Sequence, residues 1–186
     1  MFRKYRQAIL RDDGGTAASL LGKSTLDYYD EMRRLAIYGD AEAVQSQLLV
    51  DQMQILLFRL RVPVETLESL SPKGLVSFSV EQGWIGKSGV SKVEPGRVQS
   101  KEDIAIMHVI IDGKDGGSGF RFDREANGWR LDLVSTLKNS NAMFAGAARR
   151  EGVSNNRYML AVMGNALKRE VGDEVWVPLR TSEEAE

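Results

Sequence analysis

Few side chains of this chain are of the types that take part in catalysis. His108 is the only histidine, and the chain contains no cysteine. A Ser-His-Asp arrangement would therefore have to use His108, while thiol catalysis and disulfide bonds are excluded. His108 alternates with isoleucines in a strand-like run from Ile104 to Ile110, where a lone histidine is more typical of packing than of catalysis. If that strand face is concave, His108 points into a pocket.

A carboxylate and a tyrosine complete the set of candidate catalytic residues. Asp51 lies on a long apolar helix, where burial would raise its pKa and let it act as a base. The alternative, which the sequence favours, is a solvated position beside Gln47 and Gln54. Tyr29 is the candidate hydrogen-bond donor. Catalysis would require these side chains to converge within hydrogen-bond reach in one pocket.

The same inventory argues against several cofactors and partners. One histidine, no cysteine and no tight group of Asp and Glu do not provide the usual ligands of a transition metal, so we expect no metal and no other cofactor. The glycine-rich segment 112–117 lacks the Gly-Lys-Ser/Thr ending of a phosphate loop. A net charge of −1 argues against a nucleic-acid partner, because phosphate contacts need clustered Lys and Arg.

Length and composition are typical of a globular protein. With 186 residues and 42% hydrophobic content, the chain suits one domain with a full core, or one domain with an extension. Its longest apolar run is far shorter than the roughly 20 residues of a membrane-spanning helix. The start, MFRKYRQAIL, is basic but has neither a long apolar segment nor a cleavage site. We expect a cytoplasmic protein without a membrane span; a removed signal or lipid anchor would leave no trace here.

The first part of the chain shows the periodicity of amphipathic helices. The expected helices cover residues 3–10, 16–21, 24–38, 41–61 and 64–70. The Asp-Asp-Gly-Gly run at 12–15 is predicted to separate the first two. Ser24 is predicted to cap the third helix, Gly39 to end it in the left-handed conformation, and Asp40 to cap the fourth.

The helix over 41–61 is predicted to bury one face and expose the other. The apolar residues of the buried face are Leu49, Val50, Met53, Leu56, Leu57 and Leu60. The residues of the polar face are Gln45, Asp51, Gln52, Gln54 and Arg59. Leu48, Ile55 and Phe58 break this polar face. We favour their burial under a second layer of the same protein, and the alternative is that they line a pocket or a subunit interface.

From residue 75 to residue 133 the sequence alternates in a way that is typical of strands. The expected strands cover 76–80, in a run that ends near Trp84-Ile85, then 90–98 with an interruption at Pro95-Gly96, 103–111, 120–123 and 129–133. A turn is expected over 86–89, and the glycine-rich segment 112–117 is expected to be a loop between strands. The last two form a hairpin, because Asn127-Gly128 tolerates the positive φ of a tight turn. Helices followed by antiparallel strands predict an α+β fold, in which a curved sheet packs on the N-terminal helices.

The residues after the hairpin are predicted to form a C-terminal helical extension, so that the expected domains are 1–136 and 137–186. Helices are expected over 142–150 and 156–170, with Ser154 or Asn155 capping the second. Met159, Met163 and Leu167 form a stripe on this second helix, which is more typical of a core than of an adaptable binding surface. The segment 175–179 should be extended and docked on the domain or on a neighbouring subunit, and 181–186 disordered.

Two stretches carry a resemblance to a known family. LAIYGDAEAV at 35–44 and FRFDREANGWRLDLVS at 120–135, together with the antiparallel strands, resemble the nuclear transport factor 2-like superfamily. That superfamily includes ketosteroid isomerases and SnoaL-like polyketide cyclases. The resemblance spans about residues 24–136. It implies a cone-shaped, cystatin-like roll that encloses a pocket, and frequent dimerisation through the sheet.

The catalytic positions of the isomerases do not carry over to this chain. The tyrosine that they place seven residues before the Gly-Asp glycine is Met32 here. Their base belongs to an Asp-rich segment, whereas here a helix is predicted to continue through 51–60. The resemblance therefore implies the fold without the isomerase chemistry.

Two functions follow from these patterns. The first is a non-catalytic binding or assembly module, a homodimer with a pocket for a small apolar ligand or a partner peptide. Its expected pocket residues are Tyr29, Arg33, Ile55, Phe58, Trp84 and His108. The second is a small isomerase-like or cyclase-like enzyme for an apolar substrate, using His108 or Asp51 with Tyr29. We favour the first because the expected catalytic positions are missing.

Overall fold

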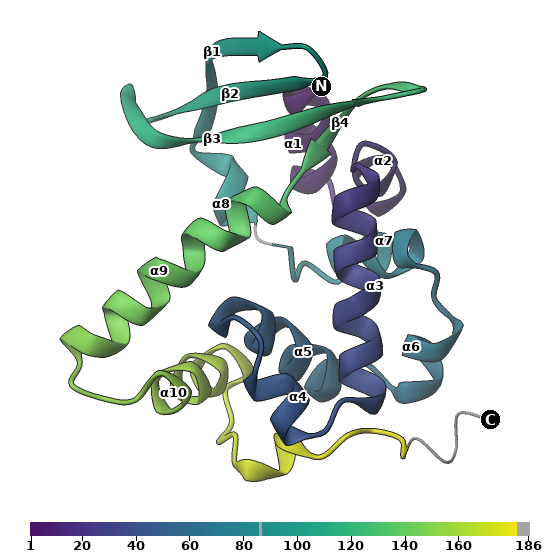
Figure 1. Ribbon diagram of the computed structural model, residues 1–186, viewed down its shortest axis with the longest axis vertical. Coiled ribbons are helices and arrows are strands. Elements are labelled where there is room, and N and C mark those ends of the chain that lie inside the picture. The colour runs from purple at the N-terminus through teal and green to yellow at the C-terminus, as the bar shows by residue number, and fades with distance from the viewer. Residues whose placement is uncertain (86, 182–186) are drawn as a thin grey trace. The chain divides into compact units, whose positions relative to one another are not determined.

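The chain folds into helices and one antiparallel sheet. The computed structural model describes residues 1–85 and 87–181. Within these ranges it contains ten α-helices, one 3-10 helix and an open four-stranded sheet, which confirms the predicted α+β class (Figure 1). None of the helices in the described ranges combines the length and hydropathy that crossing a bilayer requires.

The residues group into two compact units. Unit 1 comprises Met1–Tyr29 and Leu70–Thr136, and unit 2 comprises Asp30–Ser69 and Leu137–Glu186. Two helices, α3 (Lys23–Tyr38) and α9 (Val134–Arg150), contribute residues to both units. The two units are described one after the other.

The first two helices of unit 1 lie close to their predicted ranges. Helix α1 covers Phe2–Leu10, as predicted. Helix α2 covers Gly14–Ser19, so the expected break at 12–15 instead contains the start of a helix. Asp13 caps α2, because its Oδ1 accepts a hydrogen bond from the Thr16 amide at 2.9 Å.

Helix α3 begins one residue before its predicted cap. Its first residue is Lys23, and Ser24 lies inside the helix. The Lys23 amide donates to Oε1 of Glu125 at 2.7 Å, so a residue of the hairpin turn satisfies the helix terminus. The prediction that Ser24 caps this helix is wrong because the partner is distant in sequence.

The strand predicted over 76–80 is wrong, since these residues belong to helix α7 (Pro72–Glu81). Ser71 caps this helix by accepting from the Gly74 amide at 3.1 Å, and Pro72 occupies its first turn. Val76 and Val80 are both buried and lie four residues apart. That spacing fits a helical stripe as well as strand alternation, so the spacing of the apolar residues alone does not distinguish a helix from a strand.

Helix α8 (Lys87–Ser91) replaces the start of the next predicted strand and most of the turn expected at 86–89. Gly86, the first residue of that turn, lies outside the described residues. Arg6 of α1 donates to the carbonyl of Val90 at 2.9 Å and to that of Ser91 at 2.6 Å. These bonds attach the short helix to α1.

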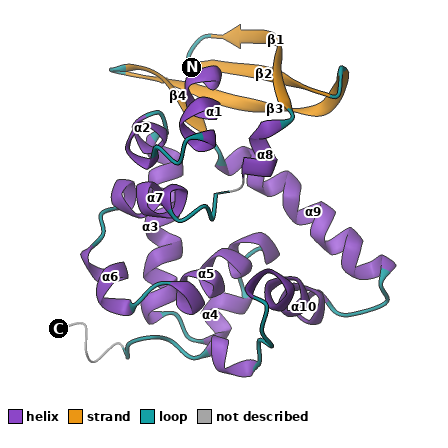
Figure 2. Ribbon diagram, turned by 180° about the vertical axis from the view of Figure 1, so that it is seen from behind, coloured by secondary structure: helices purple, strands orange, loops and turns teal. Residues whose placement is uncertain are grey.

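The sheet of unit 1 is an antiparallel meander in the order β1-β2-β3-β4 (Figure 2). Its strands are β1 (Val93–Lys101), β2 (Ile104–Ile111), β3 (Lys114–Glu125) and β4 (Gly128–Asp132). The interruption predicted at Pro95-Gly96 is a shift of register between Pro95 and Val98.

The predicted hairpin is confirmed as β3 and β4, with Phe122 opposite Leu131. Only Gly128 of the Asn-Gly pair has a positive φ, at 102°. The loop expected at 112–117 is shorter than predicted, because β3 already begins at Lys114.

One face of the sheet is covered by helix α1. The buried residues of this face are Ala105, Met107, Val109, Phe120, Phe122 and Leu131. Phe2 of α1 packs on Phe120 with ring centroids 4.9 Å apart. The alternating residues of β2, from Ile104 to Ile110, point to the opposite face and are exposed or half-buried.

Unit 2 contains the remaining helices. They are α4 (Ala41–Gln45), α5 (Leu49–Arg61), α6 (Val64–Ser69), α10 (Asn155–Leu167) and the 3-10 helix η1 (Asp173–Trp176). The single helix predicted over 41–61 is wrong, because residues 46–48 divide it. Nε2 of Gln52 stabilises this break by donating to the carbonyls of Gln45 at 3.0 Å and Gln47 at 2.9 Å.

The connection from α3 to α4 confirms one prediction and corrects another. Asp40 caps α4 by accepting from the Ala43 amide at 2.8 Å, as expected. Gly39 is not among the residues with a positive φ. A Cβ atom at Gly39 would lie 2.6 Å from the Leu35 carbonyl oxygen, so the position favours glycine because of the limited space and not because of a left-handed backbone.

The buried face of α5 differs from the predicted one. Gln52 and Arg59, assigned to the polar face, are only 6% and 8% exposed. Ile55 and Phe58 are fully buried, as our favoured interpretation of these residues requires, whereas Leu48 is 44% exposed.

The C-terminal residues pack within unit 2. Helix α9 starts at Val134, earlier than expected, and Gly152 follows its end with a positive φ of 68°. Ser154 caps α10 as predicted, accepting from the Arg157 amide at 3.3 Å. Met159 and Met163 are buried.

The segment predicted to be extended at 175–179 begins inside η1 instead. It is docked on unit 2, where the amide of Arg180 donates to the Ile37 carbonyl at 2.9 Å. Of the tail predicted to be disordered, 182–186 lies outside the described residues.

Candidate functional site

Tyr29 is a buried, neutral phenol of unit 1. Its side chain is 6% exposed, and burial raises its pKa to about 12. Tyr5 of α1 is buried too, and desolvation followed by the charge of Tyr29 raises the pKa of Tyr5. Both hydroxyl groups therefore keep their protons at physiological pH.

His108 and Trp84, the other predicted residues of unit 1, lie apart from the covered face of the sheet. His108 is half-buried on the opposite face of β2, and its Nε2 lies 3.3 Å from Oε1 of Gln99. Trp84 follows α7 and packs edge-on against Phe78, with ring centroids 5.4 Å apart. The predicted approach of His108 to a concave pocket therefore does not occur on the face that α1 covers.

The predicted site residues of unit 2 are paired, half-buried or part of the core. Arg33 pairs with Asp30, with Nη2 and Oδ1 2.8 Å apart, and also donates to the Leu67 carbonyl at 3.0 Å. Asp51 is half-buried in the first turn of α5. Ile55 and Phe58 are core residues without exposed surface.

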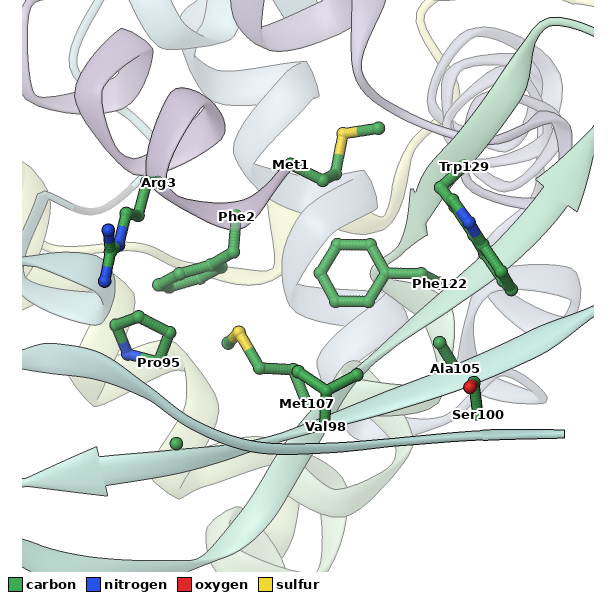
Figure 3. Close-up of a pocket in the computed structure, with 11 residues that line it drawn as sticks. Met1, Phe2, Arg3, Pro95, Val98, Ser100, Ala105, Met107, Phe122 and Trp129 are labelled. Atoms are coloured by element: carbon green, nitrogen blue, oxygen red, sulfur yellow. The ribbon is translucent and has the colours of Figure 1, made fainter.

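A groove in unit 1 lies between the first turn of α1 and the covered face of the sheet (Figure 3). We call it the sheet groove, and its volume is about 510 Å³. Its lining residues are Met1, Phe2, Arg3, Pro95, Gly96, Val98, Ser100, Ala105, Met107, Phe122 and Trp129. This volume falls within the range of roughly 300–1,000 Å³ that is typical of ligand sites. None of the sequence-predicted pocket residues is among them.

The sheet groove has a buried apolar floor and an exposed rim. Phe2, Met107 and Phe122 of the floor are each less than a tenth exposed, at 4%, 3% and 6%. On the rim, Val98 is 60% exposed and Met1 is 43% exposed. A large apolar side chain that remains exposed beside a concave apolar floor is typical of a binding surface.

Small residues in neighbouring strands open the hollow. Ser100 of β1 lies opposite Ala105 of β2, and Ala105 lies opposite Phe122 of β3. The small pair leaves space beside the aromatic ring, since opposite side chains in a sheet share one face. Gly96 lets β1 approach β2 closely, because a Cβ there would lie 3.0 Å from the His108 carbonyl oxygen.

The lining residues suit binding rather than a recognisable reaction. Arg3 provides their one charged side chain, and the lining set contains neither a side-chain carboxylate nor an imidazole that could serve as a base. Among the described residues, no three His, Asp or Glu side chains come together as a metal site would require.

Comparison of the chain with protein-family models, with curated proteins and with solved structures finds no match. The function of the sheet groove is therefore argued from its own residues.

Sequence reasoning missed this groove because its walls come from distant segments. Phe2, Val98 and Trp129 meet only when α1 packs on the sheet. The available signals were the amphipathic start of the chain and a valine within an otherwise polar strand. Neither signal could show that the two segments face each other.

Proposed function

We propose that the protein is a binding module whose sheet groove holds a small apolar ligand or the apolar side chains of a partner peptide. The observation that carries this proposal is the exposed Val98 beside the buried apolar floor formed by Met107 and Phe122. An apolar ligand would remove this surface from water, which gains roughly 25 cal/mol per Å².

The size of the groove sets an expected affinity. Each buried methylene of a ligand contributes about 0.8 kcal/mol, so an apolar body of about eight carbons gains roughly 6 kcal/mol. The loss of translational and rotational freedom on association offsets several kcal/mol of this gain. The net gain is then below about 4 kcal/mol, so we expect dissociation constants in the millimolar range.

Val98→Asp should weaken binding of an uncharged apolar probe, N-phenyl-1-naphthylamine, by about tenfold or more. The new carboxylate on the rim would lose water when the probe binds, and this desolvation is unfavourable. Probe fluorescence measures the dissociation constant directly.

Val177→Asp is the matched control, since Val177 of unit 2 is 63% exposed and Val98 is 60% exposed. Because Val177 belongs to unit 2 and the groove to unit 1, we expect this control to keep the affinity of the unmodified protein within about twofold. Both sites are exposed and therefore tolerate a polar residue. Equal affinities of the two variants would contradict the proposed function.

The alternative, a small isomerase-like or cyclase-like enzyme, would need His108 or Asp51 to meet Tyr29 in one pocket. Neither His108 nor Tyr29 lines the sheet groove. Membership of the nuclear transport factor 2-like superfamily, a cone-shaped roll with a C-terminal extension, and homodimerisation stay predictions. The binding function depends on none of them, since unit 1 alone provides the groove.

A further inference from the structure

We propose that the ligand of the sheet groove is an amphiphile with an anionic head group, in which the apolar tail fills the groove and the head lies beside Arg3. This inference rests on the proposed function and adds the chemical class of the ligand. It follows from the charge of the groove and from the hydrogen-bonding state of its one cationic side chain.

The side chains that line the groove provide positive charge and no negative charge. Its charged side chain is Arg3, and none of the lining residues that the structure describes is Asp or Glu. In Figure 3, Arg3 lies at one end of the groove close to Pro95, and Trp129 lies at the other end. A ligand can therefore place its head at the Arg3 end and its tail across the apolar floor.

Arg3 has unused donors, unlike several other arginines of unit 1. Arg6 donates to two backbone carbonyls, and Arg121 pairs with Asp123, with Nη2 and Oδ1 2.8 Å apart. The guanidinium group of Arg3 makes no hydrogen bond or ion pair with any residue in the described part of the chain, and Arg3 is exposed. A guanidinium group offers a planar set of donors that matches a carboxylate.

The first turn of α1 adds to this preference. Met1, the cap residue, provides no side-chain hydrogen bond to the helix, and the first turn contains no acidic residue. The positive end of the helix dipole therefore lies unneutralised at the mouth of the groove, where it favours a negative charge. The apolar groove with its one cationic side chain carries the inference, and the helix end supports it.

These features predict an order of affinities for ligands that share the same apolar tail and differ in the head group. A carboxylate gains a charge-assisted contact with Arg3, an alcohol gains little, and an ammonium group is repelled. Because Arg3 is exposed, we expect decanoate to bind only about fivefold more tightly than 1-decanol. Decylamine should bind more weakly than 1-decanol.

The test is calorimetric titration of the full chain with these three compounds below their aggregation limits. Arg3→Gln should reduce the preference for decanoate over 1-decanol to less than about twofold. Lys4→Gln is the matched control, because Lys4 is the next residue of α1, is exposed and does not line the groove. This control should retain the preference.

Equal affinities of decanoate and 1-decanol, or a preference that survives in Arg3→Gln, would overturn the inference. In that case, weaker binding of 1-decanol by Val98→Asp would still uphold the proposed function. If none of the three compounds binds, the inference fails as well, and the N-phenyl-1-naphthylamine titration then decides the proposed function separately.

Discussion

Replacement of Arg59 by methionine is expected to lower the free energy of unfolding by about 3 kcal/mol or more. Arg59 is 8% exposed, and the carbonyls of Ala36, Leu35 and Val175 each accept from its guanidinium group at 2.9 Å. The Gly39 carbonyl accepts as well. Methionine keeps much of the apolar stem but removes the donors of these carbonyls, which is unfavourable where the carbonyls are buried.

The bonds of Arg59 join three segments of unit 2. Leu35 and Ala36 belong to the last turn of α3, where the Leu35 carbonyl also accepts from the Gly39 amide at 2.9 Å, and Val175 belongs to η1. Burial lowers the pKa of Arg59 to about 10, so the group stays charged at neutral pH. We therefore regard Arg59 as the side chain that attaches η1 to the end of α3.

Urea unfolding followed by circular dichroism measures the effect. Arg34→Met is the control, because Arg34 is exposed on α3 and pairs with Glu31, with Nη2 and Oε1 2.9 Å apart. An exposed pair of this kind contributes less than about 1 kcal/mol. If the two variants lost similar stability, the bonds of Arg59 would not hold these segments together.

Gly14→Ala is expected to destabilise the protein by about 2–3 kcal/mol, although alanine is the better helix former. A Cβ atom at Gly14 would lie 2.2 Å from the backbone oxygen of Ser77 and 2.7 Å from its Oγ. Gly14 starts α2 and Ser77 lies in α7, so the two helices would have to separate. A rigid backbone oxygen cannot move aside as a flexible side chain can.

The neighbouring glycine provides the control for this prediction. A Cβ at Gly15 would have only Asp13 Oδ1 near it, at 3.9 Å, and Gly15 has no positive φ. Gly15→Ala should therefore stabilise the protein by up to about 1 kcal/mol. Opposite signs in thermal unfolding are the expected result, and equal changes would show that α2 does not pack on α7 in this way.

The sequence predicted those parts of the fold that depend on neighbouring residues. Asp40 and Ser154 cap their helices through contacts three residues away, and the hairpin turn at Gly128 is equally local. The strand predicted in place of α7 failed because Val76 and Val80 fit both periods. The cap signal of Ser71 followed by Pro72 should have outweighed the alternation.

Contacts between distant residues could not be predicted from a local pattern. Glu125 caps α3 from the hairpin turn, which made Ser24 the wrong choice. Arg59 was assigned to a solvated face because charged residues are rarely buried unless they are paired. Its partners are backbone carbonyls, which leave no signature in the sequence.

The candidate site was predicted less well than the fold for the same reason. The polar and aromatic residues that drew attention, Tyr29, Trp84 and His108, do not line the sheet groove. The residues that do line it are mostly apolar and have no distinctive spacing. Their importance comes from exposure beside a hollow, as Val98 illustrates, and exposure depends on the folded chain.

The most direct test of the sheet groove is a methyl nuclear magnetic resonance titration with methionine-labelled protein. Met107 lies on the groove floor, whereas Met159 and Met163 are buried in α10 of unit 2. Binding of N-phenyl-1-naphthylamine should shift the Met107 methyl signal, because the aromatic ring would lie beside it, and leave the other two unchanged. Bound probe with an unshifted Met107 signal would contradict the proposal that this groove is the binding site.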